Sequence, residues 1–212
     1  MPNEVDTKFL KQFRALIIGQ IKKGHRFILI TGGGKTCRNY QAALKLVASP
    51  KPLDLDWLGI YSTRFNAQLV RLMFGKLAHQ KVVENPNEKV KFQEKILVAG
   101  GWIPGRSTDD DAVRLAKTYN SKTIVNLSNI DYVYDKDPKK FKNAKKFEQM
   151  SWTDYLRLAG KKWQPGANYP FDPVAAKFAK QHQQKVIIVN GKNLKNLEKI
   201  LSSKPFIGTT IS

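Results

Sequence analysis

The stretch Phe27-Ile-Leu-Ile-Thr-Gly-Gly-Gly-Lys-Thr36 decides the fold, because it joins a short apolar run to three glycines, a lysine and a helical pattern. An apolar run of this length that ends at glycine predicts a buried strand. Three successive residues without side chains, 32–34, let backbone N–H groups approach an anion closely. The helix that follows adds unpaired N–H groups and the positive end of its dipole, and Lys35 adds a full charge. These features favour a phosphate site over a tight turn without a ligand, since such a turn needs neither a third glycine nor a lysine.

This stretch is not the P-loop of the nucleotide hydrolases. That loop requires a glycine, four further residues and then Gly-Lys-Ser/Thr. The end of the pattern is present at Gly34-Lys35-Thr36, but the position of its first glycine is occupied by Leu29. A strand residue cannot open the phosphate loop, so the stretch is a phosphate-binding design of another kind.

Strand and helix patterns alternate along the rest of the chain. Helices are predicted at 7–22, 38–47, 56–74, 108–118, 151–158, 173–183 and 194–201, strands at 27–31, 96–99, 123–127 and 186–189, a strand or turn at 208–211, and a turn at 164–168. In the second helix we expect Tyr40, Ala43, Leu44 and Val47 to face inward. The alternation predicts an α/β fold, a three-layer α/β/α sandwich with a mainly parallel central sheet. No repeat or domain boundary interrupts it, so residues 1–212 are expected to form a single domain.

Composition limits the classes of function. The chain has 212 residues, of which 42% are hydrophobic, and this content supports a real core. The single cysteine, Cys37, allows no intrachain disulfide and fits a reducing compartment. The sequence contains no apolar run of membrane-spanning length and no signal-peptide pattern at its start. We therefore expect a cytoplasmic protein without a membrane partner.

The net charge of +20 implies attraction to polyanions. The densest cluster of lysines lies at 136–146. It is accompanied by no recognition helix, RNP-like aromatic strand or zinc-ligand spacing, which are the usual companions of nucleic-acid binding. We interpret most of this charge as a solvated surface and do not expect nucleic acid as a partner.

A second glycine-rich segment is Gly100-Gly-Trp-Ile-Pro-Gly-Arg-Ser-Thr-Asp-Asp-Asp111, between a predicted strand and a predicted helix. Ser107 or Thr108 can cap that helix, and the hydroxyls, N–H groups and Arg106 suit a second phosphate. Among the three aspartates, Asp110 fits the simple role of favouring the helix dipole, and Asp109 is the better functional candidate. Two such loops at one edge of a parallel sheet can face each other across a crevice, which suggests a phosphate donor and an acceptor.

A third segment, Ser128-Asn-Ile-Asp-Tyr-Val-Tyr-Asp-Lys-Asp-Pro138, follows the predicted strand at 123–127. Its polar residues, with Tyr134 and Asp137, could hold a base and a ribose. As an isolated string it fits a surface loop equally well.

In order and spacing these motifs resemble the archaeal-type uridylate (UMP) kinases of the amino acid kinase superfamily. The first loop is similar to their GGGK-x-x-R, and the second to GG-T-x-PG-x-T-T-D. Segment 56–67, Asp-Trp-Leu-Gly-Ile-Tyr-Ser-Thr-Arg-Phe-Asn-Ala, is similar to D-x-x-G-I-x-x-T-R-x-N-A, and segment 128–138 to T-N-V-D-G-V-Y-x-x-D-P. Later landmarks match at 172–177 and 208–211, so the resemblance covers nearly the whole chain.

The resemblance implies an amino acid kinase-like fold and transfer of the ATP γ-phosphoryl group to UMP, with Mg²⁺ held mainly by the phosphates. It implies a homo-oligomer, a hexamer built from dimers. We place Lys35 and Asp109 in the catalytic role. By position, UMP would be bound by Gly33, Asp56, Trp102, Ile103, Pro104, Gly105, Arg106, Ser107 and Thr108, and ATP by Gly34, Arg38, Ser128, Asn129, Tyr134 and Asp137.

The sequence departs from the family pattern in three places. The family opens with a strand and a G-G-S loop, and neither precedes residue 7 here. We expect the loss of such a strand to leave its neighbours as sheet edges, and the chain as written to be poorly stable and weakly active. Trp102 replaces a threonine, which removes a hydroxyl from the acceptor loop, and Tyr132 replaces a glycine in the nucleotide loop.

Two alternatives stay open. One is a sister kinase of the same superfamily that acts on an acyl, carbamate or isoprenoid phosphate acceptor. The other is a non-catalytic relative that binds nucleotides or polyanions, which the missing G-G-S loop and the charge of +20 would fit.

Overall fold

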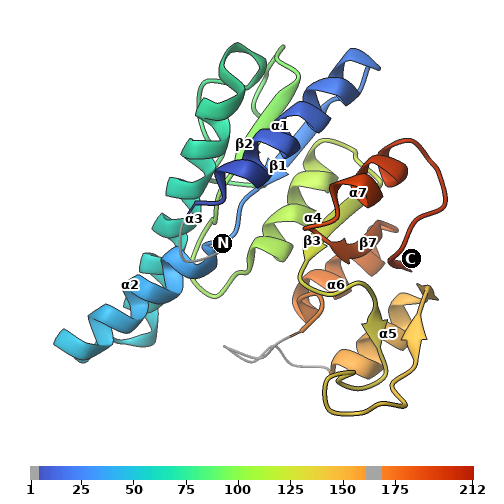
Figure 1. Cartoon of the computed structure of the whole chain (residues 1–212). Coiled ribbons are helices and arrows are strands. Elements are labelled where there is room, and N and C mark those ends of the chain that lie inside the picture. Colours follow the sequence, from blue (N-terminus) through green and yellow to red (C-terminus); the bar gives the residue numbers. More distant parts are fainter. Residues whose placement is uncertain (1–4, 161–168) are drawn as a thin grey trace. The chain divides into compact units, whose positions relative to one another are not determined.

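The structure, a computed structural model, describes residues 5–160 and 169–212. It divides into two compact units, one ending at Thr118 and one beginning at Tyr119. Figure 1 shows the order of the elements, and each unit is described separately below. The predicted turn at 164–168 lies outside the described residues. Among the residues that are described, no helix is both long and apolar enough to cross a membrane.

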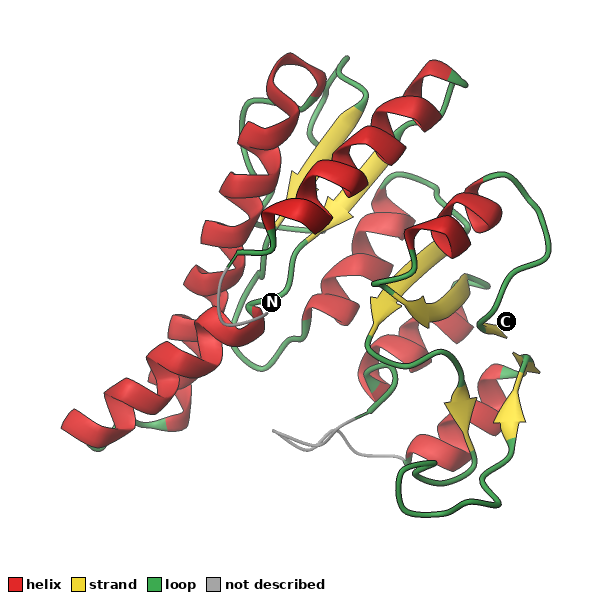
Figure 2. Cartoon of the chain, viewed as in Figure 1, coloured by secondary structure: helices red, strands yellow, loops and turns green. Residues whose placement is uncertain are grey.

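The N-terminal unit is a parallel pair of strands with four helices. Its elements are α1 (Thr7–Lys22), β1 (Phe27–Ile30), α2 (Gly34–Val47), α3 (Pro52–Phe74), a short 3-10 helix (Gly75–Leu77), β2 (Ile96–Ala99) and α4 (Thr108–Thr118). In the register of the pair, Phe27 lies opposite Ile96 and Ile30 opposite Ala99. Because the strands are parallel, the loops that leave their carboxyl ends begin at the same edge (Figure 2).

Successive side chains of a strand point to opposite faces of the sheet, and this alternation decides which residues form the core of this unit. Ile96 and Val98 of β2 point to one face, where Phe27 and Leu29 of β1 join them. Helices α1 and α3 cover that face with a cluster that includes Ile17, Ala67 and Phe74. One side of α3 is thus buried against the strands, and the opposite side of the helix faces outward.

The C-terminal unit contains a four-stranded sheet of order β3-β7-β8-β6. The pairs β3–β7 and β6–β8 are parallel, and β7–β8 is antiparallel. A separate antiparallel pair joins β4 to β5. The elements are β3 (Thr123–Ser128), β4 (Val133–Tyr134), β5 (Lys146–Phe147), β6 (Gln149–Met150), α5 (Trp152–Ala159), α6 (Pro173–Gln181), β7 (Lys185–Asn190), α7 (Leu194–Leu201) and β8 (Thr209–Ile211).

The predicted α/β class and the mainly parallel pairing are confirmed, and the helices at 108–118 and 194–201 have the predicted bounds. Three two-residue strands, β4 to β6, were not predicted, because so short a strand carries no periodicity. Among the described strands, β1 pairs only with β2 and β3 only with β7. The expectation of a lost neighbouring strand remains a prediction.

Two expectations about helix α2, its first residue and its inward face, are wrong. It begins at Gly34 rather than at position 38, so the glycine loop is shorter than the sequence suggested. Its predicted inward face is wrong, because Tyr40, Ala43 and Val47 are exposed and Leu44 is only half-buried. No side chain of this helix is fully buried. The apolar period of α2 therefore does not serve the core of its own unit.

Candidate active site

The first glycine loop ends in an uncapped helix. Helix α2 begins at Gly34, whose φ of 60° lies in the left-handed region that favours glycine. No side chain of the described residues accepts a hydrogen bond from the first turn of α2. The N–H groups of that turn are available to an anion, and the dipole of the helix adds a favourable potential. Lys35, half-buried, stands in the same turn.

The two glycine-rich loops lie together in the N-terminal unit. The N–H of Thr31 donates to the carbonyl of Ala99 (3.2 Å), which continues the β1–β2 ladder into both loops. A side-chain carbon placed on Gly32 would lie 3.9 Å from Oγ1 of Thr108. Loop 32–35 and the helix start that follows loop 102–108 therefore meet at the same edge of the strand pair. The predicted nearness of the two loops is present, and their roles as donor and acceptor sites stay a prediction.

Helix α3 fixes the first loop through a side-chain amide. Nδ2 of Asn66 donates to the carbonyl oxygens of Gly32 (2.8 Å) and Gly33 (3.2 Å). Oγ1 of Thr31 donates to the carbonyl of Thr63 (2.8 Å), one turn earlier on the same helix. These bonds fix the backbone of the loop against α3.

The same helix also fixes the second loop. Nε and Nη2 of Arg64 donate to the carbonyls of Gly101 (3.0 Å) and Trp102 (2.9 Å), and Nη1 pairs with Glu84 (2.7 Å). The N–H of Gly101 donates to Oγ1 of Thr63 (2.6 Å). Backbone contact is close here, since a side-chain carbon on Gly100 would lie 3.0 Å from the Cα of Arg64. One turn of α3, residues 63–66, thus holds both loops in one geometry.

The second glycine-rich loop has a further anchor and a cap. Oδ2 of Asp56, at the N-terminal end of α3, accepts the N–H of Gly105 (3.0 Å). Oγ of Ser107 accepts the N–H of Asp110 (3.2 Å), so Ser107 caps α4 as the sequence predicts. The predicted site residues 102–108 therefore form one ordered turn between α3 and α4.

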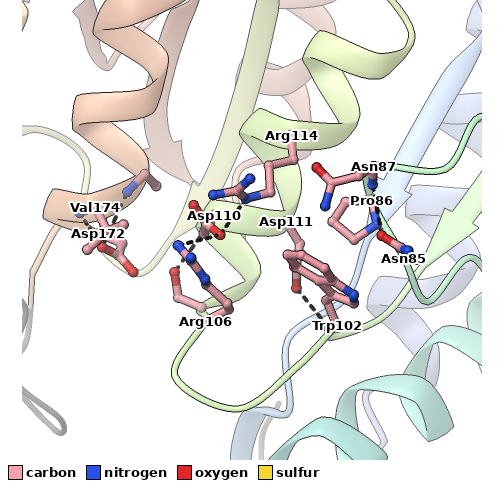
Figure 3. Close-up of polar contacts among 12 residues, drawn as sticks. Asn85, Pro86, Asn87, Trp102, Arg106, Asp110, Asp111, Arg114, Asp172 and Val174 are labelled. Carbon is pink, nitrogen blue, oxygen red and sulfur yellow. Dashed lines mark hydrogen bonds and ion pairs between the residues drawn. The ribbon is translucent and has the colours of Figure 1, made fainter.

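Asp110 does more than favour the helix dipole. Its side chain is fully buried, and Oδ2 lies 2.7 Å from Nε of Arg114 and 3.5 Å from Nη1 of Arg106 (Figure 3). Hydrogen bonds between a carboxylate and guanidinium groups are charge-assisted, so they are stronger and more specific in geometry than neutral ones. Asp110 therefore positions Arg106, a predicted UMP ligand, at the turn that leads into α4.

Asp111 supports the backbone of the second glycine-rich loop. Oδ2 of Asp111 accepts the N–H of Trp102 (3.3 Å), and the Trp102 ring lies 5.8 Å from the guanidinium carbon of Arg114. Burial, followed by the neighbouring charge of Asp110, raises the pKa of the Asp111 carboxyl from 3.8 to about 7. The Trp102 N–H and the two arginines act in the opposite direction. This carboxyl therefore changes charge near neutral pH.

The Asp111→Asn variant is expected to remove a pH dependence of stability. The folded chain holds the Asp111 proton more tightly than the unfolded chain. This contribution is complete below the ordinary pKa of 3.8 and is lost as pH rises through about 7. The loss amounts to at most about 1.4 kcal/mol per pH unit. Urea unfolding of both chains at about pH 5 and about pH 8 should show a smaller decline for the variant. Equal declines in the two chains would contradict this assignment.

The residues predicted to bind ATP are divided between the two units of the structure. Gly34 and Arg38 belong to α2 in the N-terminal unit. The other four, Ser128, Asn129, Tyr134 and Asp137, lie on or just after β3 and β4 in the C-terminal unit.

Three of these residues make local contacts within the C-terminal unit. The carbonyl of Ser128 accepts the N–H of Gly191 (2.8 Å), which ties the end of β3 to the loop after β7. Oδ1 of Asp137 accepts the N–H of Lys139 (2.9 Å) and shapes the turn that precedes β5. Tyr134 pairs with Lys146 across the β4–β5 ladder.

Sequence reasoning missed the residues that position the loops. Thr63, Arg64 and Asn66 were quoted within a family-like motif but were not assigned to the site. Asp111 was grouped with the aspartates of a helix start. The motif itself was the available signal. Polar side chains that fall on the buried side of a helix need hydrogen-bond partners, and the glycine loops provide them.

Comparisons with known proteins agree with this geometry. The model of the Amino acid kinase family matches residues 10–190. The chain is 33% identical over 211 residues to a uridylate kinase of Thermoplasma volcanium, covering 98% of this chain and 90% of that one. It is 32% identical to a uridylate kinase of Sulfolobus acidocaldarius, covering 99% and 93%. The fold is similar to that of a uridylate kinase from Archaeoglobus fulgidus, with a TM-score of 0.83, 26% identity and coverage of 100% and 94%.

Proposed function

Because the chain belongs to the amino acid kinase family, we propose that it transfers the γ-phosphoryl group of ATP to UMP and yields UDP, a step of pyrimidine nucleotide biosynthesis. The observation that carries the proposal is the meeting of two glycine-rich loops at one edge of β1 and β2, both held by residues 63–66 of α3. The names of the similar uridylate kinases supply the acceptor.

In the proposed reaction an oxygen of the UMP phosphate attacks the γ-phosphorus of ATP. The bond between this phosphorus and the β,γ-bridging oxygen breaks, and ADP leaves with the electron pair. The acceptor is already an anion, so no strong base is needed, and catalysis consists of alignment and neutralisation of charge. In this proposal the N–H groups at the start of α2 and the ammonium group of Lys35 neutralise the phosphoryl oxygens.

The acceptor side is proposed to lie on loop 102–108, together with Gly33 and Asp56. Of these two, Asp56 contacts the loop, since its Oδ2 accepts the N–H of Gly105. Asp109, in the first turn of α4, follows the second glycine loop in the chain and is proposed as a second catalytic residue. The donor side is proposed to involve Gly34, Arg38, Ser128, Asn129, Tyr134 and Asp137, with residues 1–212 acting as a single kinase-like domain.

Magnesium is proposed to enter with ATP. Within residues 5–160 and 169–212 no group of three His, Cys, Asp or Glu side chains could hold a metal ion, so the phosphates would supply most of its ligands. The cation would neutralise phosphate charge when bound. We also propose a cytoplasmic location, which the single cysteine fits, and a homohexamer.

An acceptor panel tests the proposed function. The full chain with Mg²⁺ and ATP is assayed for ADP formation with UMP, with other nucleoside monophosphates, and with acyl, carbamate and isoprenoid phosphate acceptors. We expect turnover with UMP and none with the non-nucleotide acceptors. Turnover with one of these instead would favour a sister kinase. No turnover, together with a salt-dependent affinity for RNA above that for nucleotides, would favour the non-catalytic alternative.

A further inference from the structure

Four charged side chains meet where the second glycine-rich loop enters α4 (Figure 3). Two are carboxylates, Asp110 and Asp111, which are 0% and 1% exposed. The other two are the guanidinium groups of Arg106 and Arg114, and both act on the charge of Asp111. We call these four residues the charge cluster. Since arginine keeps its charge at all ordinary pH values, the cluster is neutral when both carboxyls are ionised and has one net positive charge when one of them holds a proton.

The two carboxyls of the cluster have unequal partners. Asp110 shares its Oδ2 with the two guanidinium groups, whereas Oδ2 of Asp111 accepts the uncharged backbone N–H of Trp102 (3.3 Å). The Oδ1 atom of each is buried and accepts no hydrogen bond from any residue that the structure describes. A buried carboxylate with an unpaired oxygen is costly, and a second carboxylate beside it adds repulsion. Asp111 is therefore the member of the cluster that takes up a proton first.

The neighbouring elements leave this titration to the cluster itself. Helix α4 packs against β1 (Phe27–Ile30), whose four side chains are apolar. Toward α3, the carbonyl of Trp102 accepts Nη2 of Arg64, and this guanidinium is already paired with Glu84 (2.7 Å). Burial raises the pKa of the Asp111 carboxyl to about 7, so that its charge responds to small changes in its surroundings.

Arg106 connects Asp111 to an anion on the loop. It belongs to loop 102–108, which is proposed above to hold the UMP phosphate, and its positive charge lowers the pKa of Asp111. A phosphate bound there offsets this charge and adds negative charge near the carboxyl, so it favours the neutral form of Asp111. The coupling is reciprocal, because a neutral Asp111 leaves one net positive charge on the cluster and strengthens its hold on the anion.

We propose that Asp111 is a proton-linked positioning residue: when loop 102–108 takes up a phosphate anion, the Asp111 carboxylate takes up a proton. The inference deepens the proposed function and rests on it for the place of the anion. The proton comes from the solvent, binds to a carboxylate oxygen and returns to the solvent when the anion leaves, and no bond of the nucleotide changes. Through Arg106, the acceptor is thus held more tightly in mildly acidic than in alkaline solution.

A fluorescence titration of the full chain tests the proton uptake without relying on turnover. Trp102 reports on Asp111, since its N–H is held by that carboxyl, and its signal is the difference between the parent and Trp102→Phe chains. Both are titrated in sulfate and in chloride of equal ionic strength. Sulfate is a tetrahedral dianion that exchanges no proton near neutral pH. We expect a midpoint near pH 7 in chloride and a midpoint raised by roughly 0.5–1 pH unit in sulfate.

Two variants accompany the titration. Asp111→Asn keeps the shape of the side chain without its ionisation, and it should show no midpoint near neutral pH in either salt. Glu198→Gln is the matched control, because it removes an exposed carboxylate from α7, and it should titrate as the parent chain does. Circular dichroism verifies that each variant is folded.

The same coupling is measured with UMP by calorimetry at about pH 7.5, in buffers of different ionisation enthalpy. The phosphate of UMP also exchanges protons, so the parent is compared with Asp111→Asn. We expect the parent to take up roughly 0.3–0.5 proton more per bound UMP. Between about pH 6.5 and about pH 8.5 its KM for UMP should rise about 2–6-fold more than that of the variant, with little difference in how the turnover number changes.

Two results would each overturn the inference. One is a midpoint near neutral pH that persists in Asp111→Asn. The other is the same midpoint in both salts together with equal proton uptake by the parent and the variant. Transfer to UMP is measured separately. A shifted midpoint in a chain that does not phosphorylate UMP would refute the proposed function and leave the proton coupling standing, and transfer to UMP without any coupling would do the reverse.

Discussion

Replacing Lys35 by alanine is expected to lower the turnover number for phosphoryl transfer to UMP by at least about 100-fold. Lys35 lies in the uncapped first turn of α2, directly after the glycine loop whose carbonyls are held by Asn66. We therefore propose that its ammonium group neutralises charge on the transferred group. Because this charge matters most in the transition state, turnover should fall more than the apparent affinity for UMP.

The matched control is Lys45→Ala, which removes an exposed lysine from the last turn of the same helix. We expect it to retain the turnover of the parent chain. Initial rates of ADP release at saturating ATP and UMP provide the comparison. If Lys35→Ala kept turnover within a factor of a few, the catalytic role of Lys35 would be wrong, whatever the acceptor.

Replacing Asp110 by alanine is expected to lower the free energy of unfolding by about 3 kcal/mol. The variant leaves the largely buried guanidinium of Arg114 without the carboxylate that lies 2.7 Å from it, and it frees Arg106 as well. Breaking a buried pair from one side is costly because the remaining charge stays removed from water. Urea unfolding at neutral pH measures the change.

Glu148→Ala serves as the control for this measurement. It removes the carboxylate of an ion pair with Lys146 whose two side chains are largely exposed, and such pairs contribute little in water. We expect its unfolding curve to coincide with that of the parent chain. A similar loss in both variants would mean that burial of Asp110 has no special role, and no loss in Asp110→Ala would contradict the ion-pair assignment.

The expectations about α2 and about the aspartates show where sequence patterns lose their meaning. The apolar period at 38–47 was read as an inward face, yet Tyr40 and Val47 are exposed. Periodicity reports that a helix has an apolar side and does not report which molecule covers it. Likewise the sequence assigns Asp110 only to the helix dipole and gives Asp111 no role of its own, since both are residues of a first helical turn. Only packing separates the buried partner of two arginines from the carboxyl with the raised pKa.

The sequence by itself determined the alternation of elements, the two glycine loops and the family resemblance, because these depend on local backbone requirements and on residue order. Tertiary structure alone decided that one turn of α3 holds both loops, since Thr63, Arg64 and Asn66 reach residues more than thirty positions away. It alone also decided that the outer side of α3 stays uncovered within the described chain. Contacts between distant segments arise from packing in three dimensions, and no local pattern encodes them.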